Sequence, residues 1–298
     1  MSEFGLLDSD EADTPGDEFE EIDVEDTEAD RIARRRDREF DQFRKRIKDT
    51  EQFKVEASVF DDATFAALYK LVQDGHIDAF GAPISTGKEA NVYTALGPNE
   101  TEVAVKVYRI NASDFKDMRG YLDGDPRFEG IGSDKKKVVT AWVRKEYANL
   151  KRAQKAGVRV PEPIAVERNV LVMEYIATDE RGRAKRLNEV HIENPETAFE
   201  VLREYMRRLY RAGLVHGDLS EYNVVFHEGQ LVVIDLGQAV TIHSPNADDF
   251  LHRDCENVAN FFSRQGVDVT GEELYEWVVS EAAATNGSEA SKTASGEE

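Results

Sequence analysis

Residues 214–240 read LVHGDLSEYNVVFHEGQLVVIDLGQAV, and this stretch decides the fold. Two short apolar runs, 223–226 and 231–235, are separated by the turn residues 227–230. Alternating strand formers on either side of a Gly-containing turn are typical of a β-hairpin. We therefore predict a hairpin preceded by the polar loop 216–222.

The register of this hairpin brings three polar residues together. With the turn centred between residues 228 and 229, Asn223 faces Ile234 and Asp235 faces Tyr222. Asn223 and Asp235 then lie side by side at the open end, with Asp218 in the loop before them. Hard oxygen ligands of this kind suit Mg²⁺, and Asp218 remains as a base. The alternative, that each residue only forms a turn, fits any one of them better than the spacing of all three.

Lys106 and Glu146 each occupy a position where an unpaired charge is unfavourable. Lys106 falls within a predicted strand, Glu102 to Tyr108, whose flanking valines look buried. Glu146 interrupts an apolar stripe on a helix predicted over 139–153. Pairing the two charges satisfies both sites and places a cation where a phosphate can be held. The alternative is that both side chains extend to solvent.

A polar loop precedes the Lys106 strand. Its first four residues are Ser85, Thr86, Gly87 and Lys88, and it runs to Asn91. Backbone N–H groups and the lysine of such a loop can contact a phosphate. The loop matches no Gly-rich consensus, so an ordinary hairpin turn remains the alternative.

The remaining elements follow from apolar periodicity and from capping residues. We predict a helix from Ser58, as N-cap, to Gln73, a long mobile loop over 111–137, and a helix that begins at Asn194-Pro195 and ends at Gly213. The further predicted elements are a strand over 82–95 interrupted by the 85–91 loop, a strand over 170–176, a charged turn over 179–186, and helices over 248–265 and 271–281.

Charge is unevenly distributed along the 298 residues, whose net charge is −22. Residues 1–30 hold 14 Asp or Glu and no Lys or Arg, which predicts an acidic disordered tail. Residues 31–54 hold ten basic and five acidic residues and predict a basic helical arm. This arm either pairs with the acidic tail as a solvated face or contacts RNA. We expect a second disordered tail at 281–298.

Composition also excludes several classes of protein. The single cysteine, Cys255, rules out a disulfide framework, and we expect it to be a small buried apolar residue. No apolar run approaches the length of a membrane span, and the acidic N-terminal residues do not resemble a signal peptide. We expect a cytoplasmic protein with no membrane contact.

Several motifs in order resemble the RIO family of atypical serine kinases, and in particular its first subfamily. The motifs are Ser-Thr-Gly-Lys-Glu-Ala-Asn-Val-Tyr (85–93), Gly-Asp-Pro-Arg-Phe (124–128), Val-His-Gly-Asp-Leu-Ser-Glu-Tyr-Asn (215–223), Val-Ile-Asp-Leu-Gly-Gln-Ala-Val (233–240) and the stretch 244–257. The resemblance covers residues 50–268. It differs at Gly217, where the subfamily often has Ala.

This resemblance implies an α+β fold of the two-lobed protein-kinase type, with a β-rich N-lobe and a truncated helical C-lobe. The expected divisions are the acidic tail 1–30, the basic arm and N-terminal helical extension 31–81, the N-lobe 82–177, the C-lobe 178–280 and the tail 281–298. It also implies ATP and Mg²⁺ as cofactors, with Mn²⁺ as an alternative ion.

Site roles are carried over residue by residue. Main-chain atoms of Glu174 and Ile176 would meet adenine, and Lys106, paired with Glu146, would hold the α- and β-phosphates. Asn223 and Asp235 would bind Mg²⁺, and Asp218 would be the catalytic base. The family is also understood to act as an ATPase in maturation of the small ribosomal subunit, through an aspartyl-phosphate on the metal-binding residue, here Asp235.

Two other function classes stay open. One is a nucleotide-bound assembly clamp without turnover, and the other is a small-molecule phosphotransferase, which shares the His-Gly-Asp and Ile-Asp motifs. We expect the segment after Asp235 to be too short for the substrate pocket of the phosphotransferase. It is also too short for an ordinary activation loop with a peptide-binding lobe, and it contains no Ala-Pro-Glu.

Overall fold

The computed structural model describes residues 60–110, 118, 121–122, 134–178 and 182–280. All of them belong to one compact unit, Arg44–Glu298. The predicted acidic tail 1–30, basic arm 31–54 and tail 281–298 lie outside the described residues.

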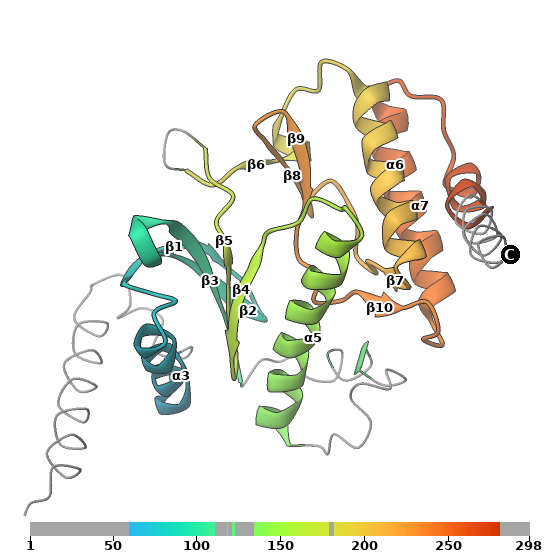
Figure 1. Cartoon of the computed structure of the whole chain (residues 1–298). Coiled ribbons are helices and arrows are strands. Elements are labelled where there is room, and N and C mark those ends of the chain that lie inside the picture. Colours follow the sequence, from blue (N-terminus) through green and yellow to red (C-terminus); the bar gives the residue numbers. More distant parts are fainter. Residues whose placement is uncertain (1–59, 111–117, 119–120, 123–133, 179–181, 281–298) are drawn as a thin grey trace, which may run out of the picture. The chain divides into compact units, whose positions relative to one another are not determined.

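A five-stranded antiparallel sheet forms the first half of the described chain, in the order β1-β2-β3-β5-β4 (Figure 1). Its strands are β1 (Ala79–Thr86), β2 (Ala90–Leu96), β3 (Glu102–Tyr108), β4 (Pro163–Glu167) and β5 (Val170–Glu174), with a short 3-10 turn η1 (Pro98–Glu100) before β3. The central strand β3 has the predicted bounds, and its residues 103–108 are all buried. Lys106 therefore lies inside the protein.

Helix α3 (Asp62–Gln73) packs beside β4 and β5. The carboxylate of Asp61 accepts the Thr64 N–H at 2.8 Å, so Asp61 caps the helix and the predicted N-cap at Ser58 is wrong. Asn169, in the β4–β5 turn, donates to Thr64 Oγ1 at 2.9 Å and joins the helix to the sheet.

Helix α5 (Lys135–Lys155) lies between the sheet and the second half of the chain (Figure 1). Asp134 caps it, and the predicted stripe around Glu146 faces the core. The predicted loop 111–137 differs from the structure in two places. Residues 135–137 already belong to α5, and Met118 and Leu122 are helical and buried because apolar side chains within that polar stretch reach the core.

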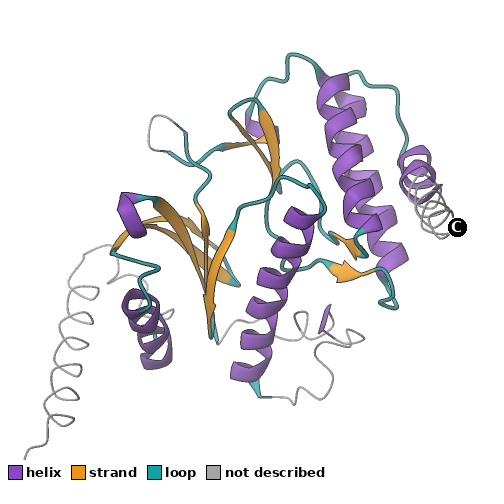
Figure 2. Cartoon of the chain, viewed as in Figure 1, coloured by secondary structure: helices purple, strands orange, loops and turns teal. Residues whose placement is uncertain are grey.

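The second half is mostly helical, as Figure 2 shows. Its helices are α6 (Pro195–Arg211), α7 (Ala247–Arg264) and the helical residues 271–280, with a 3-10 turn η3 (Leu187–Glu189). Asn194 caps α6 and Pro195 opens it, as predicted. Two small sheets complete this half, β7 (Leu214–Val215) with β10 (Val240–Thr241), and β6 (Lys185–Arg186) with β8 (Val224–His227) and β9 (Gln230–Val233).

The β8–β9 hairpin has the predicted register. Val224 pairs with Val233, and His227 with Gln230. Glu228 and Gly229 both have positive φ, 49° and 75°, which is the conformation of a two-residue turn that follows strand twist. The Ile234 N–H donates to the Asn223 carbonyl at 2.9 Å, which extends the pairing to the open end.

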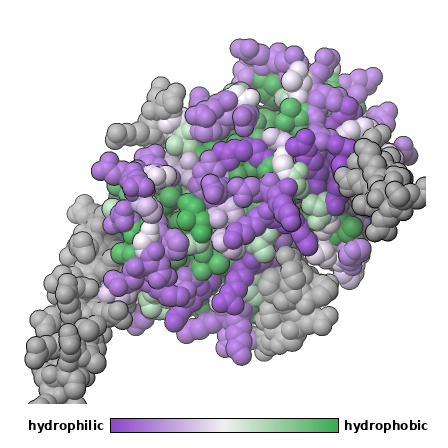
Figure 3. All heavy atoms as spheres, viewed as in Figure 1, coloured by the Kyte–Doolittle hydropathy of each residue, from purple (hydrophilic) through white to green (hydrophobic). Residues whose placement is uncertain are grey.

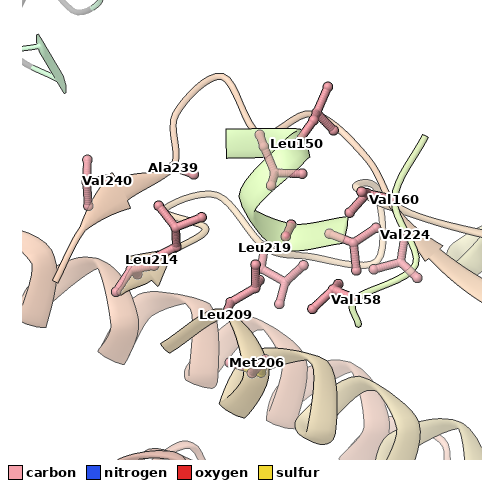
Figure 4. Packing of buried hydrophobic residues seen from close by; sticks show 14 of the residues in the cluster. Leu150, Val158, Val160, Met206, Leu209, Leu214, Leu219, Val224, Ala239 and Val240 are labelled. Atoms are coloured by element: carbon pink, nitrogen blue, oxygen red, sulfur yellow. The ribbon is translucent and has the colours of Figure 1, made fainter. Parts of the chain in front are cut away.

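One apolar core runs from α5 to α7 (Figure 4). Its members include Leu150 of α5, Met206 and Leu209 of α6, and Leu219 of the loop after β7, which Figure 4 labels. Cys255 is fully buried in the same core, as expected. Polar side chains cover most of the face in Figure 3, with small apolar areas between them. Within the described residues, no helix is both long and apolar enough to cross a membrane.

Candidate active site

Lys106 joins the two halves of the described chain. Its Nζ lies 2.8 Å from Glu146 Oε1 and 2.9 Å from Asp235 Oδ1. Glu146 is 1 % exposed and also accepts a hydrogen bond from the Tyr108 hydroxyl. The structure therefore pairs Lys106 with Glu146 in the interior, and neither side chain extends to solvent.

The two partners of Lys106 keep it charged. Desolvation disfavours the ammonium, but the charges of Asp235 and Glu146 outweigh it and raise the pKa of Lys106 well above its usual value. Desolvation likewise opposes ionisation of Asp235, yet the charge and hydrogen bond of Lys106 hold the pKa of that carboxyl below its usual value. At neutral pH the site thus contains an ammonium and a carboxylate in contact.

Helix α7 holds the loop that carries Asp218. The Asp254 carboxylate accepts the N–H groups of Gly217 and Leu219, each at 2.7 Å, and Asn257 Nδ2 donates to the Leu219 carbonyl at 3.1 Å. Gly217 has a φ of 79°, and a Cβ there would lie 3.1 Å from the Gln238 carbonyl oxygen. Both features favour glycine at this position, although the subfamily often has Ala there.

Asp218 lies beside Asn223 and His216. Asn223 Nδ2 donates to Asp218 Oδ2 at 3.1 Å and to the Asp218 carbonyl at 2.8 Å. The Asp218 N–H donates to His216 Nδ1 at 3.3 Å, and His216 Nε2 lies 3.1 Å from the Ile234 carbonyl. Burial lowers the pKa of His216, so the ring is neutral with its proton on Nε2.

The environment of Asp218 makes it a better base. Desolvation, together with the negative charge of Asp235, raises the pKa of Asp218 above its usual value, although His216 and the Asn223 hydrogen bond act in the opposite direction. A carboxylate with a raised pKa accepts a proton more readily at neutral pH.

A cavity of about 180 Å³ opens at this cluster. Six of the residues predicted for the site line it: Ser85, Lys106, Glu174, Ile176, Asn223 and Asp235. Glu146 and Asp218 do not line it, and act on it through Lys106 and Asn223. Apolar side chains of Ala104, Met173 and Ile234 form much of the remaining wall.

Glu174 and Ile176, called the hinge residues below, line the cavity where β5 ends. Both carboxylate oxygens of Glu174 bind Arg159, at 2.7 and 2.5 Å, which holds the pKa of Glu174 below its usual value despite partial burial. The Ile176 carbonyl accepts the Ala184 N–H at 2.8 Å. Among the described residues nothing accepts a hydrogen bond from the Ile176 N–H. Arg159 also accepts the Val233 N–H through its carbonyl at 2.9 Å.

The 85–91 loop reaches the cavity only through Ser85. Thr86, Gly87 and Lys88 are exposed and do not line it. The Gly87 N–H donates to the Ala90 carbonyl at 3.0 Å and to Asn91 Oδ1 at 3.3 Å. The predicted loop over 85–91 is therefore shorter in the structure and consists of the turn 87–89. Ser85 and Thr86 belong to β1 and pair with β2, and Ala90 and Asn91 belong to β2.

A larger cavity, of about 460 Å³, lies between residues 187–201 and the β8–β9 hairpin. Its walls are mostly apolar, and none of the predicted site residues lines it. Among the described residues, no group of three or more His, Cys, Asp or Glu could hold a metal ion. A metal at the first cavity would thus depend on few protein ligands.

Comparison with known proteins identifies this arrangement. The family model of the RIO domain matches residues 91–274, which is more than half of the chain. The chain belongs to the RIO family of protein kinases.

Curated relatives and solved structures agree with this assignment. A RIO-type serine/threonine-protein kinase Rio1 from Haloferax volcanii is 72 % identical over 276 residues, 93 % of this chain and 95 % of that one. Rio1 from Methanocaldococcus jannaschii is 38 % identical over 246 residues, 81 % and 83 % of the two chains. The structure of Rio2 kinase from Chaetomium thermophilum aligns with a TM-score of 0.55 and 23 % identity over 72 % of this chain and 67 % of that one.

The expected two-lobed protein-kinase-like fold is thereby confirmed. This RIO kinase is a serine/threonine protein kinase of the Rio1 type. The five-stranded sheet and α5 come first in the described chain, and the helices α6 and α7 follow; the boundary between the expected lobes at residues 177 and 178 stays a prediction.

Three polar residues of this RIO kinase were not singled out from the sequence. Asp254 interrupts an apolar stripe on α7, the same signal that identified Glu146, and could have been found in that way. Lys145 and Asn149 are fully buried on α5 and bind main-chain carbonyls of residues 236–239. No local pattern indicates those distant partners.

Proposed function

We propose that this RIO kinase binds Mg²⁺-ATP in the cavity at Lys106 and transfers the γ-phosphoryl group to a serine hydroxyl or to Asp235. The observation that carries the proposal is the Lys106 ammonium held between Glu146 and Asp235, with Asn223 lining the same cavity. This combination provides a fixed cation and two oxygen ligands at one place.

The residues present fit a magnesium ion. Asp235 supplies a carboxylate that Lys106 keeps ionised. Asn223 directs its Nδ2 to Asp218, which leaves the amide oxygen to coordinate. Mg²⁺ accepts one or two protein oxygens and completes its shell with water and phosphate oxygens. When bound, the ion would neutralise charge on the phosphates, and Mn²⁺ would compete for the same ligands.

The remaining parts of the nucleotide would meet main-chain groups and Lys106. Adenine would lie at the hinge, against the Glu174 carbonyl and the Ile176 N–H, because the Glu174 side chain is engaged by Arg159. Lys106 would hold the α- and β-phosphates, and Ser85 would lie near the triphosphate. The role of Thr86, Gly87 and Lys88 in phosphate contact stays a prediction.

Two acceptors fit the chemistry. In one, Asp218 removes the proton of a serine hydroxyl, whose oxygen attacks the γ-phosphorus as the bond to the β-phosphate oxygen breaks. In the other, a carboxylate oxygen of Asp235 makes the same attack, and water later cleaves the acyl phosphate to inorganic phosphate. A solved Rio2 kinase of 21 % identity contains ADP, Mg²⁺ and phosphoaspartate, which supports the second route.

Incubation of the full chain with Mg²⁺ and γ-labelled ATP, followed by hydroxylamine, tests the proposal. Hydroxylamine-sensitive label that Asp235→Asn does not acquire is expected, with Asp268→Asn, an exposed aspartate far along the chain, as the matched control. Resistant label would indicate transfer to serine or threonine. Nucleotide binding without label or hydrolysis would favour the assembly clamp instead, and absence of nucleotide binding would overturn the proposal.

We further propose that this kinase acts on precursors of the small ribosomal subunit and contacts their RNA through the basic arm 31–54. The excess of ten basic over five acidic residues in the arm supports the RNA contact. Cosedimentation with precursor particles across a salt series tests it. Deletion of 31–54 is expected to weaken binding and reduce its salt dependence, whereas an unchanged salt slope would exclude the arm.

A further inference from the structure

Helix α5 binds the 235–239 loop through two side chains, Lys145 and Asn149. Lys145 Nζ donates to the Gly237 carbonyl at 2.8 Å. Asn149 Nδ2 donates to the carbonyls of Leu236, at 3.2 Å, and Ala239, at 3.0 Å. Lys145 and Asn149 are four residues apart, on one face of the helix, and both are fully buried.

A lysine in this position is unfavourable unless its contacts offset the desolvation of the charge. The Lys145 ammonium lies 4.8 Å from the Trp142 ring centroid and 5.8 Å from that of Tyr121, in addition to its bond to Gly237. Two ring faces and a carbonyl together form a site shaped for a cation. Lys145 thus binds the loop from a buried position in which these contacts compensate its charge.

The loop that receives these bonds has an unusual backbone. Asp235 has a φ of 61°, in the left-handed region that non-glycine residues rarely adopt. Such a conformation persists only where the surroundings determine it. A Cβ on Gly237 would lie 3.2 Å from Trp142 Nε1 and 3.4 Å from Asp235 Oδ1, so the loop is also pressed against α5.

We propose that Lys145 and Asn149 are positioning residues, which hold the Asp235 backbone so that its carboxylate meets Mg²⁺. This inference rests on the proposed function, because it takes Asp235 as a metal ligand. Lys106 orients the Asp235 side chain, and Glu146 fixes Lys106. Lys145 and Asn149 orient the backbone on which that side chain stands, so a single helix determines both.

A positioning role and a general loss of structure have different effects on two affinities, because a general loss of structure would lower both. Affinity for a nucleotide without metal depends on the hinge, the apolar walls and Lys106. The gain in affinity on adding Mg²⁺ depends in addition on where Asp235 stands. Outer contacts that orient a metal ligand commonly change metal affinity by about 10-fold or more.

The test measures binding of a fluorescent ADP analogue to the full chain in EDTA and in Mg²⁺. Lys145→Met and Asn149→Ala are expected to leave the dissociation constant in EDTA within about twofold and to reduce the Mg²⁺-dependent gain about tenfold. Arg144→Met, an exposed residue next to Lys145 on the same helix, is the matched control and is expected to behave as wild type.

Three results would overturn the inference. The first is a wild-type Mg²⁺ gain in both variants, and the second is an equal loss of binding in EDTA and in Mg²⁺. If Lys145→Met does not fold, Asn149→Ala decides alone, since it removes two neutral hydrogen bonds and keeps the ammonium. The third is wild-type protein that binds nucleotide with no Mg²⁺ gain, which would remove the proposed metal site itself. When wild type does show the gain, the first two results overturn only the positioning roles and leave the proposed metal site in place.

Discussion

The 235–239 loop and the 85–91 loop contribute to the same cavity but are held very differently. Leu236, Gly237 and Ala239 are buried, and side chains of α5 bind their carbonyls. The 85–91 loop is largely exposed. Its contact with the interior is through the buried side chain of Asn91, which accepts the Gly87 N–H. The difference indicates that the 235–239 loop is held more firmly than the exposed turn at Gly87 and Lys88.

Energetics agree with this division. The left-handed backbone of Asp235 costs about 1 kcal/mol, and only a well-packed surrounding maintains it. The exposed turn residues Gly87 and Lys88 can change conformation with little loss of packing, whereas the rest of the segment is held by pairing of β1 with β2. Changes in the rigid loop are therefore expected to affect chemistry, and changes in the exposed loop to affect nucleotide binding.

The largest effect is expected at the rigid loop itself. Asp235→Ala removes the carboxylate that faces Lys106 and the metal, so Mg²⁺-dependent ATP hydrolysis should fall to the level without protein. Phosphate release measures this, and circular dichroism checks that the fold remains. Hydrolysis at the wild-type rate would remove Asp235 from the site.

Loss of the central cation is expected to have the next largest effect. Lys106→Met leaves the Glu146 carboxylate buried without its partner, which destabilises the fold by about 3–5 kcal/mol. Urea denaturation measures the free energy of unfolding. The double variant Lys106→Met/Glu146→Leu should regain most of the stability but none of the ATP affinity. Full stability in the single variant would contradict a buried ion pair.

A third prediction concerns the pH dependence of folding stability. It arises from Asp254, which binds the loop that carries Asp218. Burial raises the pKa of Asp254 from 3.8 to about 7, although the N–H groups of Gly217 and Leu219 favour its charged form. Between pH 3.8 and about pH 7, the Asp254 carboxyl therefore carries a proton in the folded protein but not in the unfolded chain. This contribution to stability is present below pH 3.8 and is lost as pH rises through about 7.

Denaturation of wild type and Asp254→Asn across pH 4–8 isolates this contribution. The difference in free energy of unfolding, wild type minus variant, should fall as pH rises, by at most about 1.4 kcal/mol per pH unit. It should level off above pH 7. A difference that rises with pH would mean that the carboxyl is fully ionised in the fold.

A smaller effect is expected in the exposed loop. Asn91→Ala removes the acceptor for the Gly87 N–H and the donor to the Tyr93 hydroxyl, bonds worth about 1–3 kcal/mol. The KM for ATP should rise severalfold while kcat stays within about twofold, because the 235–239 loop is untouched. Steady-state kinetics decides this, and a fall in kcat at constant KM would show that the two loops are coupled.

The smallest effect is expected outside the cavity. Removal of residues 1–30 takes away 14 acidic side chains and is expected to leave Tm almost unchanged, since such a composition does not form a core. Thermal unfolding of the two chains measures it. A decrease of many degrees would show that the segment packs.

The sequence predicts local features well where a short-range rule applies. The bounds of β3 and the register of the β8–β9 hairpin follow from alternation and from Glu228-Gly229, and the structure confirms both. The pairing of Lys106 with Glu146 follows from the unfavourable burial of either charge alone. The N-cap at Asp61 was missed because Ser58 satisfies the same pattern three residues earlier.

Long-range side-chain partners could not be predicted in this way. Lys145 and Gly237 are 92 residues apart, and the lysine looks like any polar residue of a helix. The contact between the Glu174 carboxylate and Arg159 could not be predicted either. Arg159 precedes β4 whereas Glu174 ends β5, and no sequence pattern links the two. Met118, Tyr121 and Leu122 have helical spacing, but the glycines Gly120 and Gly124 beside them indicate a loop, so the helical state of these three residues was not predicted.

Arg159 links two walls of the cavity. Its side chain binds both carboxylate oxygens of Glu174, and its carbonyl accepts the Val233 N–H of β9. Val233 lies two residues before Asp235, so this one residue connects the end of β5 to the hairpin that leads to Asp235. A displacement of β5 at Glu174 would therefore be transmitted to the opposite wall of the same cavity.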